Sequence, residues 1–412
     1  MQRVRISSQQ SPVQRLGHPQ MTLSPRFRLA SSMTPSSSFR LWSPPPESRG
    51  PLIPGLPDDV ALNCLLRLPV DTHAACRSVC LRWRLLLSDK EHFFTQRKAL
   101  GLSDPFLFTF AFHRCTGKIQ WLVLDLARHS WHPIPAMPCR GKVCPHGFGC
   151  IAFPLDGSLM VCGGLVSDLD CPLHLVLKYS VLKNKWTVTA RMHTARSFFA
   201  SGVIDGRVYV AGGYSADQFE LSSAEVFDPV RGDWKPVASM GANMACYDSA
   251  VLGRKLYVTE GWMWPFLASP IGQVYDPKND SWAPMAVGMR EGWTGPSVVV
   301  GSRLFVVSER EGMRVKVYDA DSDCWDIVGG SSVPERIRKP YAVSANGNRI
   351  YVVGRGLRVA VGHVQKSEFG DGNGNRNGNG RERFCIQWQE IDAPAPRVYG
   401  DLTPSSTRIV FA

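Results

Sequence analysis

The chain has 412 residues, of which 44% are hydrophobic, 20% charged and 10% aromatic, and its formal net charge is +12. This composition is typical of a soluble globular protein and excludes fibrous and wholly disordered classes. No stretch reaches the roughly 18 apolar residues that span a bilayer, so we expect no membrane association. Half of the excess positive charge lies in residues 1–50, and the rest of the chain has no basic run, so we also expect no nucleic-acid partner.

Residues 1–50 are rich in serine, arginine and proline and show no periodicity that could bury a face, which predicts a disordered tail. A cleaved organelle transit peptide has a similar composition and is the alternative interpretation. Met21 and Met33 leave a later start open. The 12 cysteines are too sparse for the disulfide framework of a small secreted domain, which favours the cytoplasm or nucleus.

The pattern changes to that of short helices at residue 51. Pro57 followed by two aspartates is typical of a helix start, because proline suits the first turn and carboxylates favour the positive end of a helix. Pro69 ends this helix. A second helical run is predicted from apolar residues at steps of three and four, namely Ala75, Val79, Trp83 and Leu86 or Leu87. Two or three such helices bury too little apolar surface to be stable alone, which implies a partner.

Three strings in this segment carry a resemblance to a known module: Leu56-Pro57-Asp58-Asp59-Val60, Leu65 to Pro69, and Arg77-Ser78-Val79-Cys80-Leu81-Arg82-Trp83-Arg84. They resemble an F-box, which we place at residues 51–98. The resemblance implies docking to a Skp-type adaptor. By motif position it carries over seven docking or module-core residues: Leu56, Pro57, Leu65, Leu68, Pro69, Val79 and Trp83. How the seven divide between these two roles stays open, and a generic helical cap is the alternative.

Internal periodicity is the strongest signal in the rest of the chain. Five similar segments begin at residues 159, 208, 256, 304 and 350. Their spacing of 46 to 49 residues indicates propeller blades. A second pattern places a tryptophan six residues after an aspartate, or after Ser180 in one unit: Asp125 and Trp131, Asp228 and Trp234, Asp276 and Trp282, Asp319 and Trp325, Ser180 and Trp186. We expect the Gly-Gly pairs to allow close backbone approach, each aspartate to close a turn, and each tryptophan to fill the space between blades.

The Gly-Gly, Tyr-Asp and Trp positions resemble kelch repeats over residues 104–412, which implies a mainly β fold with a six-bladed kelch-type propeller. Unit five has Ser308-Glu309 in place of Gly-Gly, and a Gly/Asn-rich insert at about 366–382 is predicted to be disordered. The first unit lacks an initial strand, whereas residues 407–412 form an apolar strand without later partners. We therefore predict that the C-terminal strand completes blade one.

Residues for catalysis or metal binding do not stand out, so we expect no catalytic residues, no metal and no cofactor. Cys139, Cys144, His146 and Cys150 come closest to a zinc set but lack a paired Cys-x-x-Cys clamp. Some kelch propellers are copper oxidases or iron-dependent specifier proteins, but the Tyr and His set of the first and the clustered acids of the second are not visible here. A metal-dependent propeller enzyme therefore remains only an alternative.

A binding surface is expected where loops after the Gly-Gly strands and linkers between blades emerge on one face. Tryptophan, tyrosine and arginine dominate the energetics of protein interfaces. The candidate substrate-binding residues are Arg196, Tyr214, Phe219, Tyr247, Trp262, Trp264, Arg290, Trp293, Arg336 and Arg338. The two tryptophans at 262 and 264 could instead fold back over their own blade, and the arginines at 336 and 338 could be merely solvated.

An F-box followed by a kelch propeller resembles plant-type F-box/kelch-repeat proteins. The resemblance implies a non-catalytic substrate-recognition subunit of a Skp-cullin-F-box ubiquitin ligase, in the cytoplasm or nucleus. Its partners would be the Skp-type adaptor, the cullin-RING ligase reached through it, and an unidentified protein substrate. A kelch scaffold without a ligase role is the main alternative.

Overall fold

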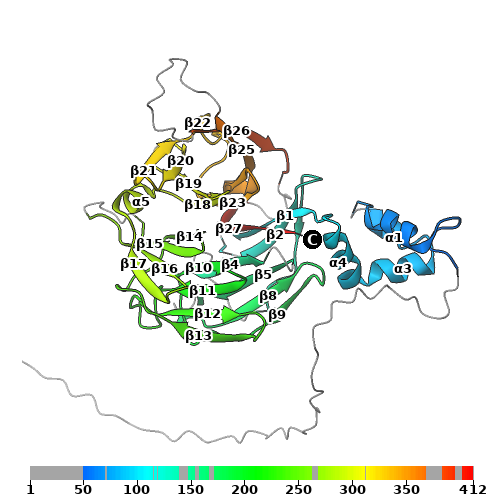
Figure 1. The fold of residues 1–412 in the computed structure, drawn as a ribbon, viewed down its shortest axis with the longest axis horizontal. Helices are drawn as coiled ribbons and strands as arrows, with labels where there is room; N and C mark the ends of the chain where they lie inside the picture. Colours follow the sequence, from blue (N-terminus) through cyan, green and yellow to red (C-terminus); the bar gives the residue numbers. More distant parts are fainter. Residues whose placement is uncertain are drawn as a thin grey trace, which may run out of the picture. The chain divides into compact units, whose positions relative to one another are not determined.

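The computed structural model describes residues 50–69, 72–114, 116–117, 119–138, 147–153, 157–166, 171–261, 268–310, 312–367, 383–394 and 401–411. Helices occupy the first part of this range, and strands in six blades around a common centre occupy the rest (Figure 1). The predicted disordered tail, apart from Gly50, and residues 368–382 of the predicted insert lie outside the described residues. No described helix is long and apolar enough to cross a membrane.

Four helices form the N-terminal module: α1 (Asp58–Leu66), α2 (Thr72–Cys76), α3 (Leu81–Ser88) and α4 (Lys90–Ala99). The predicted start of the first helix is confirmed, since Pro57 precedes α1 and Asp58 and Asp59 occupy its first turn. Five side chains make the centre of the module and are almost fully buried: Leu65, Leu66, Leu86, Leu87 and Phe93.

The predicted second helical run is divided into two helices, because α2 ends at Cys76 and α3 begins at Leu81. Cys80 between them has an extended backbone, with φ −157° and ψ 167°, and its Sγ accepts a hydrogen bond from the Trp83 backbone N–H at 3.4 Å. This contact caps the start of α3 in the way that serine or aspartate usually does. Apolar residues continue at intervals of three and four through this break between the two helices. The spacing alone could therefore not locate the break.

Each blade is built on four antiparallel strands, and blade six carries a fifth short strand; the strands of each blade are named in order from its inner to its outer edge. Blade one has β27 (Leu402–Phe411), β1 (Pro105–His113), β2 (Ile119–Asp125) and β3 (Ser130–Pro133). Blade two has β4 (Phe148–Phe153), β5 (Ser158–Gly163), β8 (Val176–Ser180) and β9 (Lys185–Val188). Blade three has β10 (Ala200–Ile204), β11 (Arg207–Ala211), β12 (Ala224–Asp228) and β13 (Asp233–Val237).

Blade four has β14 (Asp248–Leu252), β15 (Lys255–Thr259), β16 (Gly272–Asp276) and β17 (Ser281–Pro284). Blade five has β18 (Ser297–Val300), β19 (Arg303–Val307), β20 (Val315–Asp319) and β21 (Cys324–Ile327). Blade six has β23 (Ala342–Asn346), β24 (Arg349–Val353), β25 (Val359–Ser367) and β26 (Arg383–Ile391), with β22 (Gly329–Gly330) pairing parallel to β26 at its outer edge. The remaining elements lie in loops and linkers: β6 (Leu165–Val166), β7 (Cys171–Pro172), α5 (Val287–Gly292) and the short 3-10 helix Arg355–Leu357.

The predicted ring closure is confirmed. Strand β27 from the C-terminus is the inner strand of blade one and pairs antiparallel with β1, with Thr109 opposite Thr407 and Phe106 opposite Val410. Thr407 and Val410 are fully buried. The first and last parts of the propeller sequence therefore share one blade, which leaves no open gap in the ring.

The predicted roles of the repeated residues are also confirmed. Asp125 Oδ1 accepts hydrogen bonds from the backbone N–H groups of Ala127 and Arg128, and so closes the turn before β3. The tryptophan of each outer strand donates its Nε1–H to a backbone carbonyl in the linker that leaves the preceding blade: Trp131 to Ala393, Trp186 to Pro135, Trp234 to Ala190, Trp282 to Ala238, Trp325 to Gly288, and Trp388 to Ser331. These six contacts join neighbouring blades around the ring.

The Gly-Gly pairs allow a close approach to the inter-blade linkers. Gly212 and Gly213 have φ values of 68° and 93°, which favour glycine. A Cβ atom on Gly213 would lie 2.4 Å from the Ser197 carbonyl oxygen, so a side chain would not fit. In blade five, where Ser308 and Glu309 replace the pair, neither residue has a positive φ, so the chain leaves β19 along a different path.

Candidate partner-binding surfaces

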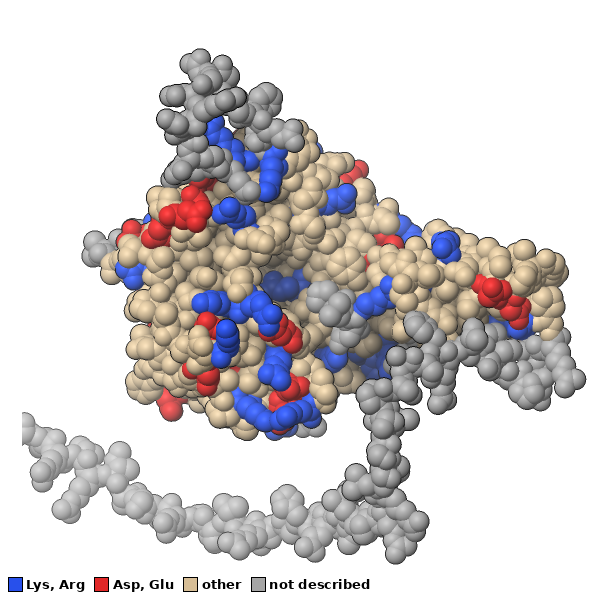
Figure 2. All heavy atoms as spheres, in the orientation of Figure 1, with Lys and Arg blue, Asp and Glu red and all other residues tan. Residues whose placement is uncertain are grey.

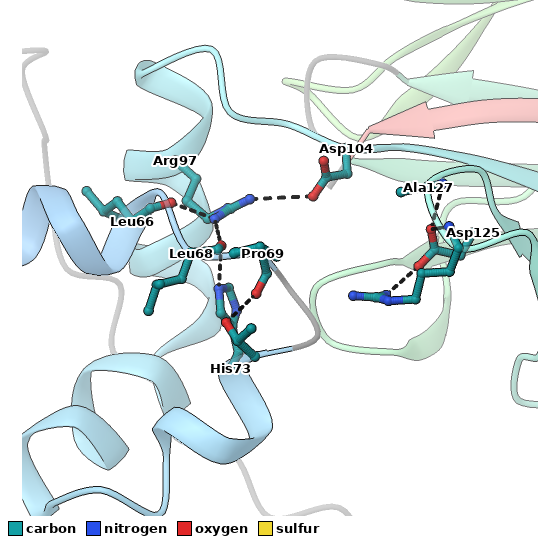
Figure 3. A network of polar contacts seen from close by, with 10 residues as sticks. Leu66, Leu68, Pro69, His73, Arg97, Asp104, Asp125 and Ala127 are labelled. Carbon is teal, nitrogen blue, oxygen red and sulfur yellow. Dashed lines mark hydrogen bonds and ion pairs between the residues drawn. The ribbon is translucent and has the colours of Figure 1, made fainter.

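The helical module is held together by a buried arginine on α4. The Arg97 guanidinium is only 4% exposed and donates to the carbonyl oxygens of Leu66 and Leu68 at 2.5 and 2.6 Å (Figure 3). These carbonyls lie at the end of α1, where a helix dipole favours a cation. Asp104 lies 3.4 Å from the same guanidinium. Burial lowers the pKa of Arg97, and the Asp104 carboxylate opposes this. Arg97 thus fixes α4 against the end of α1.

The segment before α1 is fixed by three contacts. The backbone N–H of Leu52 donates to Asp58 Oδ1 at 2.7 Å, and the Leu52 carbonyl accepts from Trp83 Nε1 at 2.7 Å. The other carboxylate oxygen of Asp58 lies 3.0 Å from the Arg82 guanidinium. The Leu52 N–H and the Arg82 guanidinium hold the pKa of Asp58 below its usual value of 3.8. These contacts set the position from which Leu56 and Pro57 emerge.

The lowered pKa of Asp58 predicts an acid-dependent contribution to the module. Its stabilising effect is fully present above the unfolded value near 3.8 and is lost as the pH falls through the lower folded pKa. We expect Asp58→Asn to lower the thermal midpoint of the helical signal at pH 7, and the difference from wild type to shrink as the pH falls below about 4. Circular dichroism melting measures both. Asp59→Asn, at the exposed neighbouring position, is the control, and an equal effect of both variants would contradict the assignment.

The seven predicted adaptor-binding residues divide between core and surface. Leu65 is 1% exposed and belongs to the core, while Leu68 and Trp83 are half-buried. The other four are exposed: Leu56, Pro57, Pro69 and Val79. Val60 and Leu81 were not among the seven, yet they are 42% and 60% exposed. Both lie inside the matched strings, so a search of those strings for large apolar residues could have found them.

We call the exposed apolar residues Leu56, Val60, Val79 and Leu81 the docking residues. Val79 is 62% exposed because it lies in the turn between α2 and α3 and not on a helix face. All four present apolar surface to solvent within 26 residues of one small helical module, which makes them candidates for a protein-binding surface.

The propeller has two ends, which we call face A and face B. Face A carries the loops between second and third strands together with the linkers between blades, and face B is formed by the opposite ends of the strands. The predicted gathering of the two loop classes on one face follows from this strand order. Phe219 and Tyr247 on face A are 72% and 49% exposed, and Arg336 and Arg338 are exposed as well. Tyr214 and Arg290 are half-buried, while Trp262 and Trp264 lie outside the described residues.

Two predicted substrate-binding residues, Arg196 and Trp293, are fully buried, so this part of the prediction is wrong. Trp293 donates its Nε1–H to Asp248 Oδ2 at 3.1 Å. Burial raises the pKa of Asp248, while the hydrogen bonds from Trp293 and Ser297 oppose this shift. Position in a linker could be predicted, but the direction of the side chain depends on the neighbouring blade.

Arg196 joins the linker before blade three to the blade itself. Its guanidinium donates to the carbonyl oxygens of Gly212 and Ser223, both at 2.9 Å, and pairs with Glu225 Oε1 at 2.8 Å. Glu225, in β12, also accepts the backbone N–H groups of His193 and Thr194 at 2.8 and 3.0 Å. This buried pair therefore has a structural role.

A cavity of about 700 Å³ lies along the centre of the propeller, and Figure 2 shows the surface hollowed there. Its wall is formed mainly by the inner strands of the blades. Ser201, Ser249 and Ser297 line it at equivalent positions, opposite Val210, Val258 and Val306. Tyr247 and Glu309 also line the cavity, and the Tyr247 hydroxyl donates to Glu309 Oε2 at 3.2 Å.

Most of the four candidate zinc ligands lie outside the described residues. Cys139, Cys144 and His146 lie there, while Cys150 is buried in β4. Burial raises the pKa of the Cys150 thiol, with the Arg408 guanidinium opposing the shift. Within the described ranges, no three His, Cys, Asp or Glu side chains come together as a metal site.

The fold and these surfaces define a kelch-type propeller protein with an N-terminal helical docking module. Family models agree with both parts: the F-box domain matches residues 53–95, and the FKB95 Kelch-repeats domain matches residues 161–359.

Relatives extend the likeness over the whole chain. An F-box/kelch-repeat protein of Arabidopsis thaliana is 56% identical over 413 residues, which cover 100% of both chains. The F-box protein AFR from the same plant is 38% identical over 365 residues, covering 88% of this chain and 93% of that protein. The chain belongs to the F-box/kelch-repeat family.

Proposed function

We propose that this protein is the substrate-recognition subunit of a Skp-cullin-F-box ubiquitin ligase. The helical module binds a Skp-type adaptor, and face A of the propeller binds a target protein. The chain itself catalyses no covalent step of ubiquitin transfer. It raises the effective concentration of the target near the ubiquitin-loaded enzyme by holding both partners.

The observation that carries the proposal is the set of exposed docking residues on an F-box module. Leu56 and Val60 lie at the start of α1, while Val79 and Leu81 flank Cys80 at the start of α3. Because these side chains are exposed, they do not form the core of the module. Their burial against a partner would stabilise the module by removing apolar surface from water. A Skp-type adaptor is the partner that F-box membership suggests.

The proposed location is the cytoplasm or nucleus, where such ligases would meet their targets. The nine cysteines of the described residues are all free thiols, including exposed Cys64, Cys80, Cys171 and Cys324. Free thiols at the surface are typical of a reducing compartment.

Adaptor binding is expected to depend on the docking residues. The double variant Val79→Asp, Leu81→Asp places two carboxylates in the proposed interface, and we expect it to weaken adaptor binding at least about a hundredfold. Leu56→Ala with Pro57→Ala should weaken it less, because truncation removes contact area without adding charge. Pull-down of the co-expressed adaptor, followed by titration, measures both effects.

The control is Val230→Asp, at a position 96% exposed in a face B turn of blade three. The Val79→Asp, Leu81→Asp variant and the Val230→Asp control should keep the wild-type melting temperature, because these three side chains are at least 60% exposed. Equal binding by wild type and the Val79, Leu81 variant would refute the proposed interface, and failure of the folded wild type to bind would refute the proposed function.

A further inference from the structure

Positive charge on face A is concentrated over blades five and six. Three segments meet there: residues 308–314 after β19, residues 331–341 between the two blades, and residues 354–358 after β24. Together they hold seven cationic residues, which we call the basic rim: Arg310, Arg314, Arg336, Arg338, Lys339, Arg355 and Arg358. The same segments hold three acids, Glu309, Glu311 and Glu335.

The three segments form one surface, because hydrogen bonds link them. The Arg355 backbone N–H donates to the Arg338 carbonyl at 2.9 Å, which joins the last two segments. Lys339 Nζ donates to the Glu309 carbonyl at 2.5 Å, which joins the first two. The three segments are therefore held together by hydrogen bonds to backbone carbonyl groups.

Several basic side chains on face B form ion pairs within their own blade. There, the first residue of the second strand pairs with the aspartate that closes the outer turn: Arg207 with Asp228 at 3.4 Å, Lys255 with Asp276 at 3.1 Å, and Arg303 with Asp319 at 3.8 Å. In each of blades three, four and five, one cation on face B is therefore neutralised by a carboxylate of the same blade.

Several cations of the basic rim lack this neutralisation. Arg314, Arg338 and Arg358 are exposed, and none pairs with a carboxylate among the described residues. Arg336 does approach Glu390, but at 3.8 Å and with 74% of its side chain exposed, which makes a weak pair. Folding does not require unpaired exposed arginines, and arginine forks suit bidentate binding of carboxylates.

The rest of face A argues against an extended polyanion as the ligand. The loops of blades three and four on this face carry Asp217, Glu220 and Glu260, with the exposed Phe219 beside them in sequence. A nucleic acid or an anionic membrane crossing the face would meet this acidic side as well as the basic rim, and would be repelled there. A short acidic segment can occupy the rim alone.

We propose that the basic rim binds a segment of a target protein that is rich in aspartate and glutamate. This inference rests on the proposed function, because it identifies the class of segment that the receptor recruits. Arg314, Arg338 and Arg358 hold its carboxylates, and the acidic loops of blades three and four confine the segment to the rim by repelling it.

The test uses the purified full chain and a fluorescein-labelled peptide of alternating aspartate and glutamate, with binding followed by fluorescence anisotropy. We expect saturable binding that weakens with added salt. The triple variant Arg314→Gln, Arg338→Gln, Arg358→Gln should bind at least about tenfold more weakly. The matched control is Lys185→Gln, Arg231→Gln, Lys278→Gln, which removes the same charge from exposed positions at face B turns and should bind like wild type.

Equal weakening by both triple variants would overturn the proposal, because it would show a general charge effect. Absence of peptide binding by wild type, or tighter binding of a short duplex DNA that depends on the rim, would also overturn it. Adaptor binding is measured on the same preparations. Retained adaptor binding without peptide binding sinks this inference alone, whereas loss of adaptor binding by the wild type sinks the proposed function.

Discussion

Removal of residues 405–412 should abolish cooperative folding of the propeller. The deletion takes away most of β27, including Thr407, Ile409 and Val410, which are at most 6% exposed. Burial of the two aliphatic side chains alone is worth about 1.5 to 3 kcal/mol each. The deletion also leaves the inner edge of β1 without its backbone partners, and it removes the packing of Ile409 against blade six and of Val410 against blade two. The summed loss approaches the whole stability of a typical domain, about 5 to 15 kcal/mol.

Urea unfolding followed by tryptophan fluorescence measures this effect. The truncated chain should lack a cooperative transition, whereas removal of residues 2–9, which leaves every described residue in place, should not change it. A truncated chain that melts with the wild-type midpoint and slope would show that β27 is dispensable, contrary to the ring closure.

Glu225→Ala is expected to cost about 3 to 5 kcal/mol of unfolding free energy. The change leaves the Arg196 guanidinium, which is fully buried, without its carboxylate partner. It also removes the acceptor of the His193 and Thr194 backbone N–H groups. Urea titration of the full chain measures the loss. Asp217→Ala, at an exposed position of the same blade, should stay within about 0.5 kcal/mol of wild type.

A double variant separates charge from packing at this site. Arg196→Met with Glu225→Leu removes both charges and keeps apolar volume, so it should be clearly more stable than Glu225→Ala. The coupling between Arg196 and Glu225 would be absent if the double variant lost as much unfolding free energy as the single variants Arg196→Met and Glu225→Leu lose in sum. That result would contradict the structural role of the pair.

Most of the propeller could be predicted because its determinants repeat. The spacing of Asp228 to Trp234 and of Asp276 to Trp282 reflects one turn and one inter-blade contact made several times, so each copy supports the others. Closure of the ring could be predicted because a missing strand at one end matched a surplus strand at the other. The helix break at Cys80 occurs once and depends on a sulfur cap, so no repetition revealed it.

The binding surfaces could be predicted less completely. Linker membership places Arg196 and Arg338 in similar positions along the sequence, yet the first is buried beside Glu225 and the second is exposed. The difference depends on whether the adjoining blade offers a buried carboxylate. The motif positions of the F-box gave the right segment, but exposure separates the core residue Leu65 from Val79 at the surface.

We propose that one chain joins an adaptor to a target through two separate surfaces, the helical module and face A of the propeller. Titration of the purified full chain with a Skp-type adaptor by calorimetry tests the binding of the adaptor most directly. We expect a single 1:1 complex that forms with wild type and is lost in the Val79→Asp, Leu81→Asp variant. A wild-type chain that is fully folded and binds no Skp-type adaptor would contradict it.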